Sequence, residues 1–229
     1  MNQDHNQDHG MEQLLNLVAK LRDPIDGCPW DIAQTFASTV PHTLEEAYEV
    51  ADAIEKNDLV LLKEELGDLL LQIVLYSQIA KEKNLFAFAD ITAGITEKLI
   101  RRHPHVFGNA NGKVGSAEEQ LAVWEALKKD EQRSKNQPSR DGIATALPAL
   151  ARAKKLCMLL ELSQVDSSSF FSIIETIEEK ATELRSSAMP KEQNIGDLLF
   201  ACVNLARKLQ IDPEVALRQA NGRAERLLR

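Results

Sequence analysis

The sequence is poor in residues that define several common protein classes. It has only three cysteines in 229 residues, Cys28, Cys157 and Cys202, and they are odd in number and far apart. This spacing excludes a disulfide framework and a cysteine metal knuckle, and it favours a reducing compartment. Ten glycines and a hydrophobic fraction of 44% suit a helical globular protein. We therefore expect a cytoplasmic protein with one large or two small helical domains.

Long apolar runs and an excess of basic residues are also missing. The longest apolar stretch, around Leu69–Leu75, is bounded by Asp68 and is too short to cross a bilayer. Residues 1–10 lack the basic-then-apolar pattern of a secretion signal. The net charge of −8 argues against a surface that coats nucleic acid, although not against a local phosphate pocket. We expect neither a membrane nor a nucleic-acid partner.

The most informative stretch runs from Thr43 to Asn84 and predicts two helices folded back on each other. A turn is expected at residues 56–58, with Asp58 as the N-cap of the second helix. Thr43 with Glu46 three residues later matches a capping box. We therefore expect the first helix to begin at Thr43.

Four carboxylates occupy matching positions in these two predicted helices. Glu49 lies eight residues before Asn57, and Glu65 lies eight residues after it. Glu46 and Asp68 lie eleven residues before and after the same position. At about 1.5 Å per residue, the members of each pair share one height in an antiparallel hairpin. Within each helix the two acids are three residues apart and share a face, so we expect all four to converge between the helices.

A converging set of carboxylates is unfavourable unless a cation neutralises it. Hard oxygen ligands without cysteine or paired histidine select Mg²⁺, Mn²⁺ or Ca²⁺. Solvated glutamates without a ligand are the alternative, but flanking leucines favour partial burial. These leucines are Leu62, Leu66, Leu69 and Leu70. The predicted metal ligands are Glu46, Glu49, Glu65 and Asp68.

Several segments, in order along the chain, resemble a known enzyme family. The strings E-E-A-Y-E at residues 45–49 and E-L-G-D at residues 65–68 are similar to the E-E-x-x-E and E-x-x-D signature of MazG-type nucleoside triphosphate pyrophosphohydrolases. The resemblance extends over nearly the whole chain, through residues 21–31, 34–35, 98–107 and 124–125. It implies Mg²⁺-dependent hydrolysis of a nucleoside triphosphate to the monophosphate and pyrophosphate, with Mn²⁺ as a possible substitute.

The resemblance also implies an assembly and roles for further residues. The family pairs hairpins between subunits into a four-helix bundle, which implies a homodimer. Glu45 lies beside Glu49 on the helix and would orient or deprotonate the attacking water. Lys98, Arg101 and Arg102 would hold the outer phosphates.

Two of these assignments have structural alternatives. The three cations end the helix predicted over residues 86–102, where they would complement the helix dipole whether or not they bind phosphate. Trp30 lies in an expected loop over residues 27–31 and would contact the substrate base or plug the core beneath the hairpin. The plug is the simpler expectation for Trp30, because buried tryptophans usually pack against apolar neighbours.

The rest of the chain predicts two related domains. Residues 1–10 repeat N-Q-D-H and predict a disordered tail rather than a metal grip by His5 and His9. The catalytic domain is expected over residues 11–132, beginning with a helix over 11–22. Near its end we expect a loop over 109–116 and a helix over 117–132 with Trp124 packed inward. A linker over 133–140 and a second domain over 141–229 follow.

The second domain reads as a degenerate copy of the first. The string G-D-L-L at residues 196–199 repeats that at 67–70, a period of 129 residues. Counting from the expected turn places four residues at the positions of the carboxylates: Leu184, Ser187, Asn194 and Asp197. With one carboxylate surviving of four, we expect all catalysis in the first domain.

Two other kinds of protein remain alternatives. One is a non-catalytic helical dimerisation module whose acids bind a partner's basic patch, which Mg²⁺-dependent pyrophosphate release would exclude. The other is a carboxylate di-iron protein built on a helical bundle. That class needs Glu-x-x-His pairs, and no histidine follows any of these acids by three residues.

Overall fold

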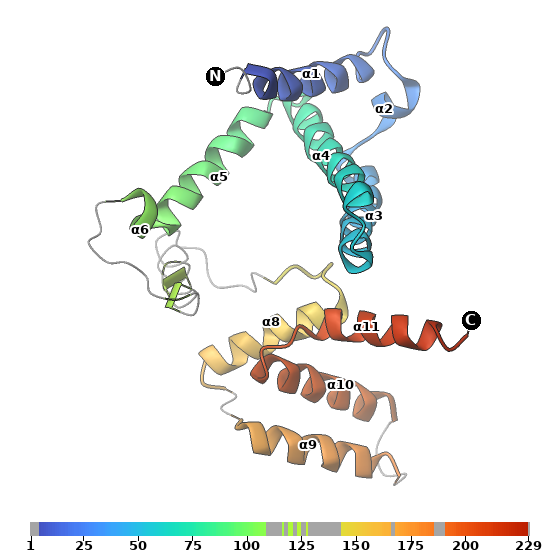
Figure 1. Cartoon of the computed structure of the whole chain (residues 1–229), viewed down its shortest axis with the longest axis vertical. Helices are drawn as coiled ribbons and strands as arrows, with labels where there is room; N and C mark the ends of the chain where they lie inside the picture. The colour runs from blue at the N-terminus through green and yellow to red at the C-terminus, as the bar shows by residue number, and fades with distance from the viewer. Residues whose placement is uncertain are drawn as a thin grey trace. The chain divides into compact units, whose positions relative to one another are not determined.

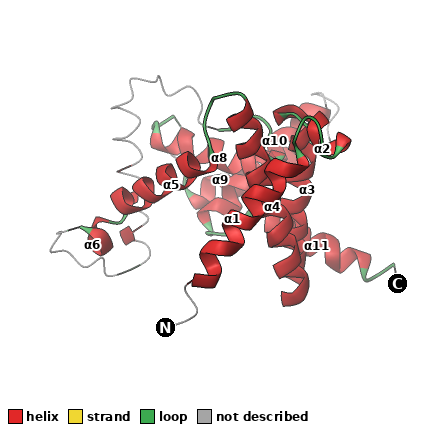
Figure 2. Ribbon diagram, turned by 90° about the horizontal axis from the view of Figure 1, so that it is seen from above, coloured by secondary structure: helices red, strands yellow, loops and turns green. Residues whose placement is uncertain are grey.

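The computed structural model describes residues 5–108, 143–165, 168–185 and 191–228, together with residues 116, 119, 120, 123, 124 and 127. The described part is all helix and loop without a strand, which confirms the predicted all-α class (Figure 2). The chain forms two compact units, residues 1–128 and 129–229. The expected linker at 133–140 lies outside the described residues, as do most of the expected loop at 109–116 and helix at 117–132. Of the helices described, none combines the length and apolarity that a bilayer span requires.

The described part of the first unit is organised around a long helical hairpin (Figure 1). Its helices are α1 (His5–Leu21), α2 (Pro29–Ala33), α3 (Phe36–Lys56), α4 (Leu59–Glu82), α5 (Phe88–Arg102) and α6 (Pro104–Phe107). Helices α3 and α4 lie side by side, and α1 packs against α4. The buried core joins Val18 of α1 to Val74, Leu75 and Ile79 of α4. This core lies in the C-terminal half of α4, so the half nearer the turn is left available for a site.

The turn of the hairpin has the predicted local chemistry. Asn57 ends α3 in the left-handed conformation with φ of 55°, which asparagine tolerates better than most residues. The Asp58 carboxylate accepts hydrogen bonds from the backbone N–H groups of Val60 at 3.1 Å and Leu61 at 3.0 Å. The predicted turn and the predicted N-cap at Asp58 are therefore confirmed.

The predicted start of the first helix is wrong. Helix α3 begins upstream of Thr43, after a capping box in which the Thr35 hydroxyl accepts from Ser38 N–H and the Ser38 hydroxyl accepts from Thr35 N–H. Thr43 lies inside the helix, and its hydroxyl bonds the Tyr76 hydroxyl of α4 at 2.9 Å. The sequence pattern was ambiguous because a threonine three residues before a glutamate also fits a helix interior, where the hydroxyl bonds the preceding turn.

Three further expectations for the first unit are corrected. Helix α1 begins at His5 rather than near residue 11, because extending a formed helix through polar residues costs less than nucleating one. Residues 29–33 form the short helix α2 rather than a loop, with Pro29 at its first position. Trp30 is 56% exposed, so it is not a core plug.

The second unit contains a shorter hairpin with a helix on either side of it in the sequence. Its described helices are α8 (Ala149–Leu162), α9 (Phe170–Glu183), α10 (Lys191–Lys208) and α11 (Pro213–Glu225). Helices α9 and α10 form the hairpin, and α8 packs against α10. Glu161 of α8 pairs with Arg207 and Lys208 of α10, which ties these two helices together.

The predicted match between the two hairpins is wrong on its first arm. Leu184 is the C-cap of α9 and so does not stand inside the helix where a carboxylate counterpart would, and Ser187 lies outside the described residues. The count assumed a tight turn, whereas α9 and α10 are separated by residues 184–190. The last turns of α9 instead carry the string E-K-A-T-E at residues 179–183, which matches E-E-A-Y-E at residues 45–49. The second hairpin therefore keeps two of the four carboxylates, Glu183 and Asp197, rather than one.

Candidate metal and nucleotide site

Acidic side chains from both arms of the α3/α4 hairpin meet at one place. A carboxylate oxygen of each of Glu46, Glu49 and Glu65 lies within 4.8 Å of the other two. No other set of three or more potential ligands meets this spacing within the part of the chain that the structure describes. The structure thus brings together three of the four predicted metal ligands, as their spacing about the turn predicted. We call this group the acidic cluster.

Asp68, the fourth predicted ligand, lies at the edge of the acidic cluster. It does not share the mutual spacing of the other three. Its charge nevertheless contributes to the raised pKa of both Glu46 and Glu65, which places it within electrostatic reach of each helix arm. One further turn of α4 separates it from Glu65, in agreement with the predicted three-residue spacing.

The acidic cluster carries more negative charge than its protein neighbours neutralise. The pKa of Glu46 is raised first by partial burial and then by the charges of Asp68 and Glu49. The pKa of Glu65 is raised first by partial burial and then by the Glu49 charge, with a further contribution from a side-chain hydrogen bond with Glu49. Protons and cations both relieve such repulsion. The donor set, which contains only carboxylate oxygens, fits a hard divalent cation.

Glu45 and Trp30 lie on either side of a residue that the sequence analysis missed. The Glu45 carboxylate lies 3.8 Å from Nδ1 of His42, and Glu45 stands outside the acidic cluster. The Trp30 ring meets the His42 ring edge-on, with centroids 5.8 Å apart. Glu45 and Trp30 are exposed, and His42 is half-buried. The available signal for His42 was its position one helical turn before Glu45.

A buried arginine positions the segment that carries Trp30. The Arg22 side chain is 6% exposed, and its guanidinium donates to both carboxylate oxygens of Glu82 at 2.9 and 2.7 Å. The same guanidinium donates to the backbone carbonyls of Asp31 and Gln34. Arg22 therefore fastens the segment around α2 to the end of α4. Sequence reasoning missed this contact, because Arg22 and Glu82 are 60 residues apart and no local pattern joins them.

The predicted phosphate-binding cations are not brought to the acidic cluster within one chain. Lys98, Arg101 and Arg102 lie in the last turns of α5, which diverges from the α3/α4 hairpin and ends beside α6 (Figure 1). The Arg102 carbonyl accepts a hydrogen bond from Trp124 Nε1 at 3.0 Å, and Trp124 is partly buried there. The assignment of Lys98, Arg101 and Arg102 to substrate binding therefore remains a prediction.

The fold and the acidic cluster together indicate a class of protein. An all-α hairpin with oxygen-only ligands from two facing helices is typical of helical proteins that bind divalent cations. Residues 34–107, which include all of α3 and α4, match the family model of the MazG nucleotide pyrophosphohydrolase domain.

Comparisons over the full length specify the family. The chain is 45% identical over 227 residues to a nucleoside triphosphate pyrophosphohydrolase of Escherichia coli strain K12, a match that covers 96% of this chain and 86% of that protein. It is 42% identical over 212 residues to a nucleoside triphosphate pyrophosphohydrolase/pyrophosphatase MazG of Thermotoga maritima, covering 91% of this chain and 80% of that one. The chain therefore belongs to the MazG family of nucleoside triphosphate pyrophosphohydrolases, as the resemblance indicated. A solved structure of a mazG-related protein from Thermotoga maritima is 31% identical and covers 52% of this chain and 98% of its own, with a TM-score of 0.43.

Proposed function

We propose that this protein hydrolyses nucleoside triphosphates to the monophosphate and pyrophosphate at the acidic cluster of the α3/α4 hairpin. The observation that carries the proposal is the meeting of Glu46, Glu49 and Glu65 within the segment that matches the family domain. Both full-length relatives carry names that describe this activity. We also propose a cytoplasmic location, because the three cysteines of the sequence are odd in number and far apart.

The acidic cluster fits a divalent cation, and Mg²⁺ is the proposed one, with Mn²⁺ as a substitute. Glu46, Glu49, Glu65 and Asp68 would hold it, since the first three already share one small space and the fourth adds charge at its edge. When bound, the ion supplies positive charge that offsets the charge of the phosphate oxygens and of the departing pyrophosphate. When no cation is present, partial burial and the neighbouring negative charges raise the pKa values of Glu46 and Glu65.

Residues of this chain accept the proton from the attacking water and contact the nucleobase. A water oxygen attacks the α-phosphorus, and the bond from that phosphorus to the oxygen bridging the α- and β-phosphates breaks. Glu45, exposed beside the acidic cluster and not among its ligands, accepts the proton that the water loses. Trp30 offers an exposed aromatic face next to His42, against which a nucleobase can stack.

The outer phosphates are assigned to Lys98, Arg101 and Arg102, which requires a second chain. Within one chain, α5 carries these cations away from the acidic cluster (Figure 1). The hairpin also leaves large apolar side chains uncovered. These are Leu44 and Tyr48 at 45%, Leu66 at 50%, Leu59 at 72% and Val60 at 80% exposure. We propose a homodimer in which two hairpins form a four-helix bundle, covering these side chains and bringing cations from one chain to the carboxylates of the other.

The test of this function is an identification of products. The purified protein is incubated with Mg²⁺ and a panel of ribo- and deoxyribonucleoside triphosphates, and the nucleotides are separated by chromatography while pyrophosphate is measured enzymatically. We expect monophosphate and pyrophosphate in equal amounts and no reaction in the presence of a chelator. Release of diphosphate and orthophosphate would contradict the proposed reaction. No turnover of any triphosphate would contradict the proposal and favour a non-catalytic dimerisation module.

A further inference from the structure

The second hairpin repeats the positions of the acidic cluster with a different set of charges. The string E-K-A-T-E on α9 puts Lys180 where α3 has Glu46, and Glu183 where α3 has Glu49. On α10, Asn194 and Asp197 stand where α4 has Glu65 and Asp68, on the repeat of G-D-L-L. The four positions of the second hairpin therefore carry a formal net charge of −1, compared with −4 in the first hairpin.

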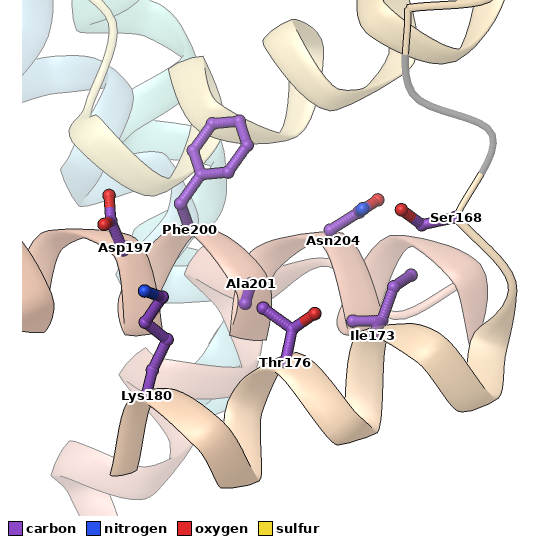
Figure 3. Close-up of a pocket in the computed structure, with 8 residues that line it drawn as sticks. All are labelled: Ser168, Ile173, Thr176, Lys180, Asp197, Phe200, Ala201 and Asn204. Carbon is purple, nitrogen blue, oxygen red and sulfur yellow. The ribbon is translucent and has the colours of Figure 1, made fainter. Parts of the chain in front are cut away.

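The lysine at this position forms an ion pair with one of the two remaining carboxylates and lies near the other. Its Nζ forms an ion pair with Glu183 Oε2 at 3.0 Å, and the two side chains are 22% and 30% exposed. Figure 3 shows Lys180 reaching from α9 toward Asp197 of the facing helix α10, across a pocket of about 260 Å³ that both residues line. The pKa of Lys180 is raised first by its hydrogen bond to Glu183, with a further contribution from the Asp197 charge. The ammonium thus interacts with one acid from each arm of the hairpin.

A buried amide stands at the position that corresponds to Glu65 in the first hairpin. Asn194 is 2% exposed, and among the described residues its Oδ1 has no hydrogen-bond partner. A glutamate at this position would bring a further negative charge next to Asp197, one helical turn away. The neutral amide avoids that repulsion. Lysine at one position and asparagine at the other both lower the demand for an external cation.

We propose that Lys180 is a tethered cation that takes the place of a metal ion in the second hairpin. With Lys180 present, α9 and α10 pack together without a divalent ion. The same four positions form a latent metal site, which would bind a metal ion if carboxylates replaced Lys180 and Asn194. The comparison rests on the proposed metal site of the first hairpin, but the interaction of Lys180 with the two acids is tested without any metal. The single positive charge of Lys180 offsets half of the negative charge of Glu183 and Asp197, and it cannot dissociate because the backbone carries it. The second unit should therefore keep the same stability whether divalent cations are present or absent.

The first experiment removes the tethered cation from the full chain. Hydrogen exchange of peptides from α9 and α10 is measured by mass spectrometry for the natural sequence, Lys180→Met and Lys180→Arg, each with a chelator and with millimolar Mg²⁺. We expect Lys180→Met to exchange about tenfold faster in chelator, because the partly buried Glu183 loses its ion pair and Asp197 loses a nearby positive charge. Mg²⁺ should restore much of the protection, and Lys180→Arg should behave like the natural sequence. Unchanged exchange in Lys180→Met, or loss of protection that Mg²⁺ does not reduce, would overturn the proposal.

The second experiment exposes the latent metal site. Mn²⁺ binding is counted by electron paramagnetic resonance in a Glu49→Gln/Glu65→Gln background, which disables the first hairpin. Adding Lys180→Glu and Asn194→Glu should create one Mn²⁺ site per chain. The matched control, Lys155→Glu with Gln193→Glu, makes the same change in net charge at exposed positions of the same unit and should create none. A variant that is helical by circular dichroism and binds no Mn²⁺ would overturn the latent site.

The two proposals can fail separately. If the natural sequence binds no Mn²⁺ at the first hairpin, the proposed function fails, while the exchange of Lys180→Met in chelator still decides whether the lysine acts as a tethered cation. If the natural sequence binds Mn²⁺ but the Lys180→Glu/Asn194→Glu variant does not, the failure belongs to the second hairpin alone.

Discussion

Glu49 and Glu65 stand on opposite arms of the α3/α4 hairpin, yet a carboxylate oxygen of one lies within 4.8 Å of a carboxylate oxygen of the other. Two negative charges at this distance repel each other unless a proton or a cation lies between them. The contact therefore means that the acidic cluster competes for a positive charge, which a proton supplies at low pH and a metal ion supplies at neutral pH.

This competition predicts how stability depends on pH when metal is absent. The pKa values of Glu46 and Glu65 are higher in the folded chain than the ordinary value of 4.5. Their contribution to the free energy of unfolding is fully present below pH 4.5 and is lost as the pH rises through the raised values. Thermal unfolding followed by tryptophan fluorescence reports the first unit, because Trp30 and Trp124 both lie in it. In chelator, we expect Glu65→Gln to show a smaller loss of midpoint on raising the pH than the natural sequence shows.

The same substitution should separate stability from metal binding. At pH 7, Glu65→Gln removes one of the repelling charges and should raise the unfolding midpoint of the metal-free protein. It should also remove most of the stabilisation that Mg²⁺ gives the natural sequence, since a ligand is lost. Glu64→Gln makes the same chemical change at the neighbouring exposed position and should leave the Mg²⁺ effect intact. An equal response to Mg²⁺ in both variants would argue against Glu65 as a ligand.

Arg22 should be required for order around Trp30. Replacing it with Met leaves Glu82 and two backbone carbonyls without their donor, and we expect the free energy of unfolding to fall by about 1–3 kcal/mol. Hydrogen exchange in residues 27–35 should increase more than in α3. Lys20→Met removes an exposed cation from the last turn of α1, two residues before Arg22, and should change neither quantity. Arg22→Lys should recover only part of the loss, because lysine lacks the planar fork that donates to four acceptor oxygens.

The success of sequence reasoning here depended on distance along the chain. The turn, the Asp58 cap and the convergence of Glu46, Glu49 and Glu65 were predictable, because a tight turn fixes the heights of residues counted from it. The same count of residues from the turn failed in the second hairpin, because the length of the connection between α9 and α10 could not be predicted from composition. As a result, Lys180 was overlooked. Contacts between distant positions, such as that of Arg22 with Glu82, leave no periodic trace in the sequence.

The predicted phosphate contacts give a separate test. Lys98→Ala should weaken the binding of a nucleoside triphosphate more than that of the monophosphate, because only the triphosphate has outer phosphates to lose a partner. Affinities are measured by calorimetry with Ca²⁺ or with a non-hydrolysable triphosphate, to prevent turnover. Lys20→Ala, on α1, serves as the control for loss of one surface cation. Equal weakening of both ligands would assign Lys98 a structural role.

Matched substitutions in the two hairpins test the location of catalysis most directly. Glu49→Gln and Glu183→Gln change the corresponding residue of each copy and keep its shape. The measurement is the rate of Mg²⁺-dependent pyrophosphate release by the full chain, with Mg²⁺ as the sole divalent ion and helical content checked for each variant. We predict that Glu49→Gln, like Asp68→Asn, loses about a hundredfold or more in turnover, while Glu183→Gln retains the rate of the natural sequence. A Glu49→Gln variant that is folded and turns over at the natural rate, or a Glu183→Gln variant that is folded and inactive, would contradict the assignment of catalysis to the first hairpin.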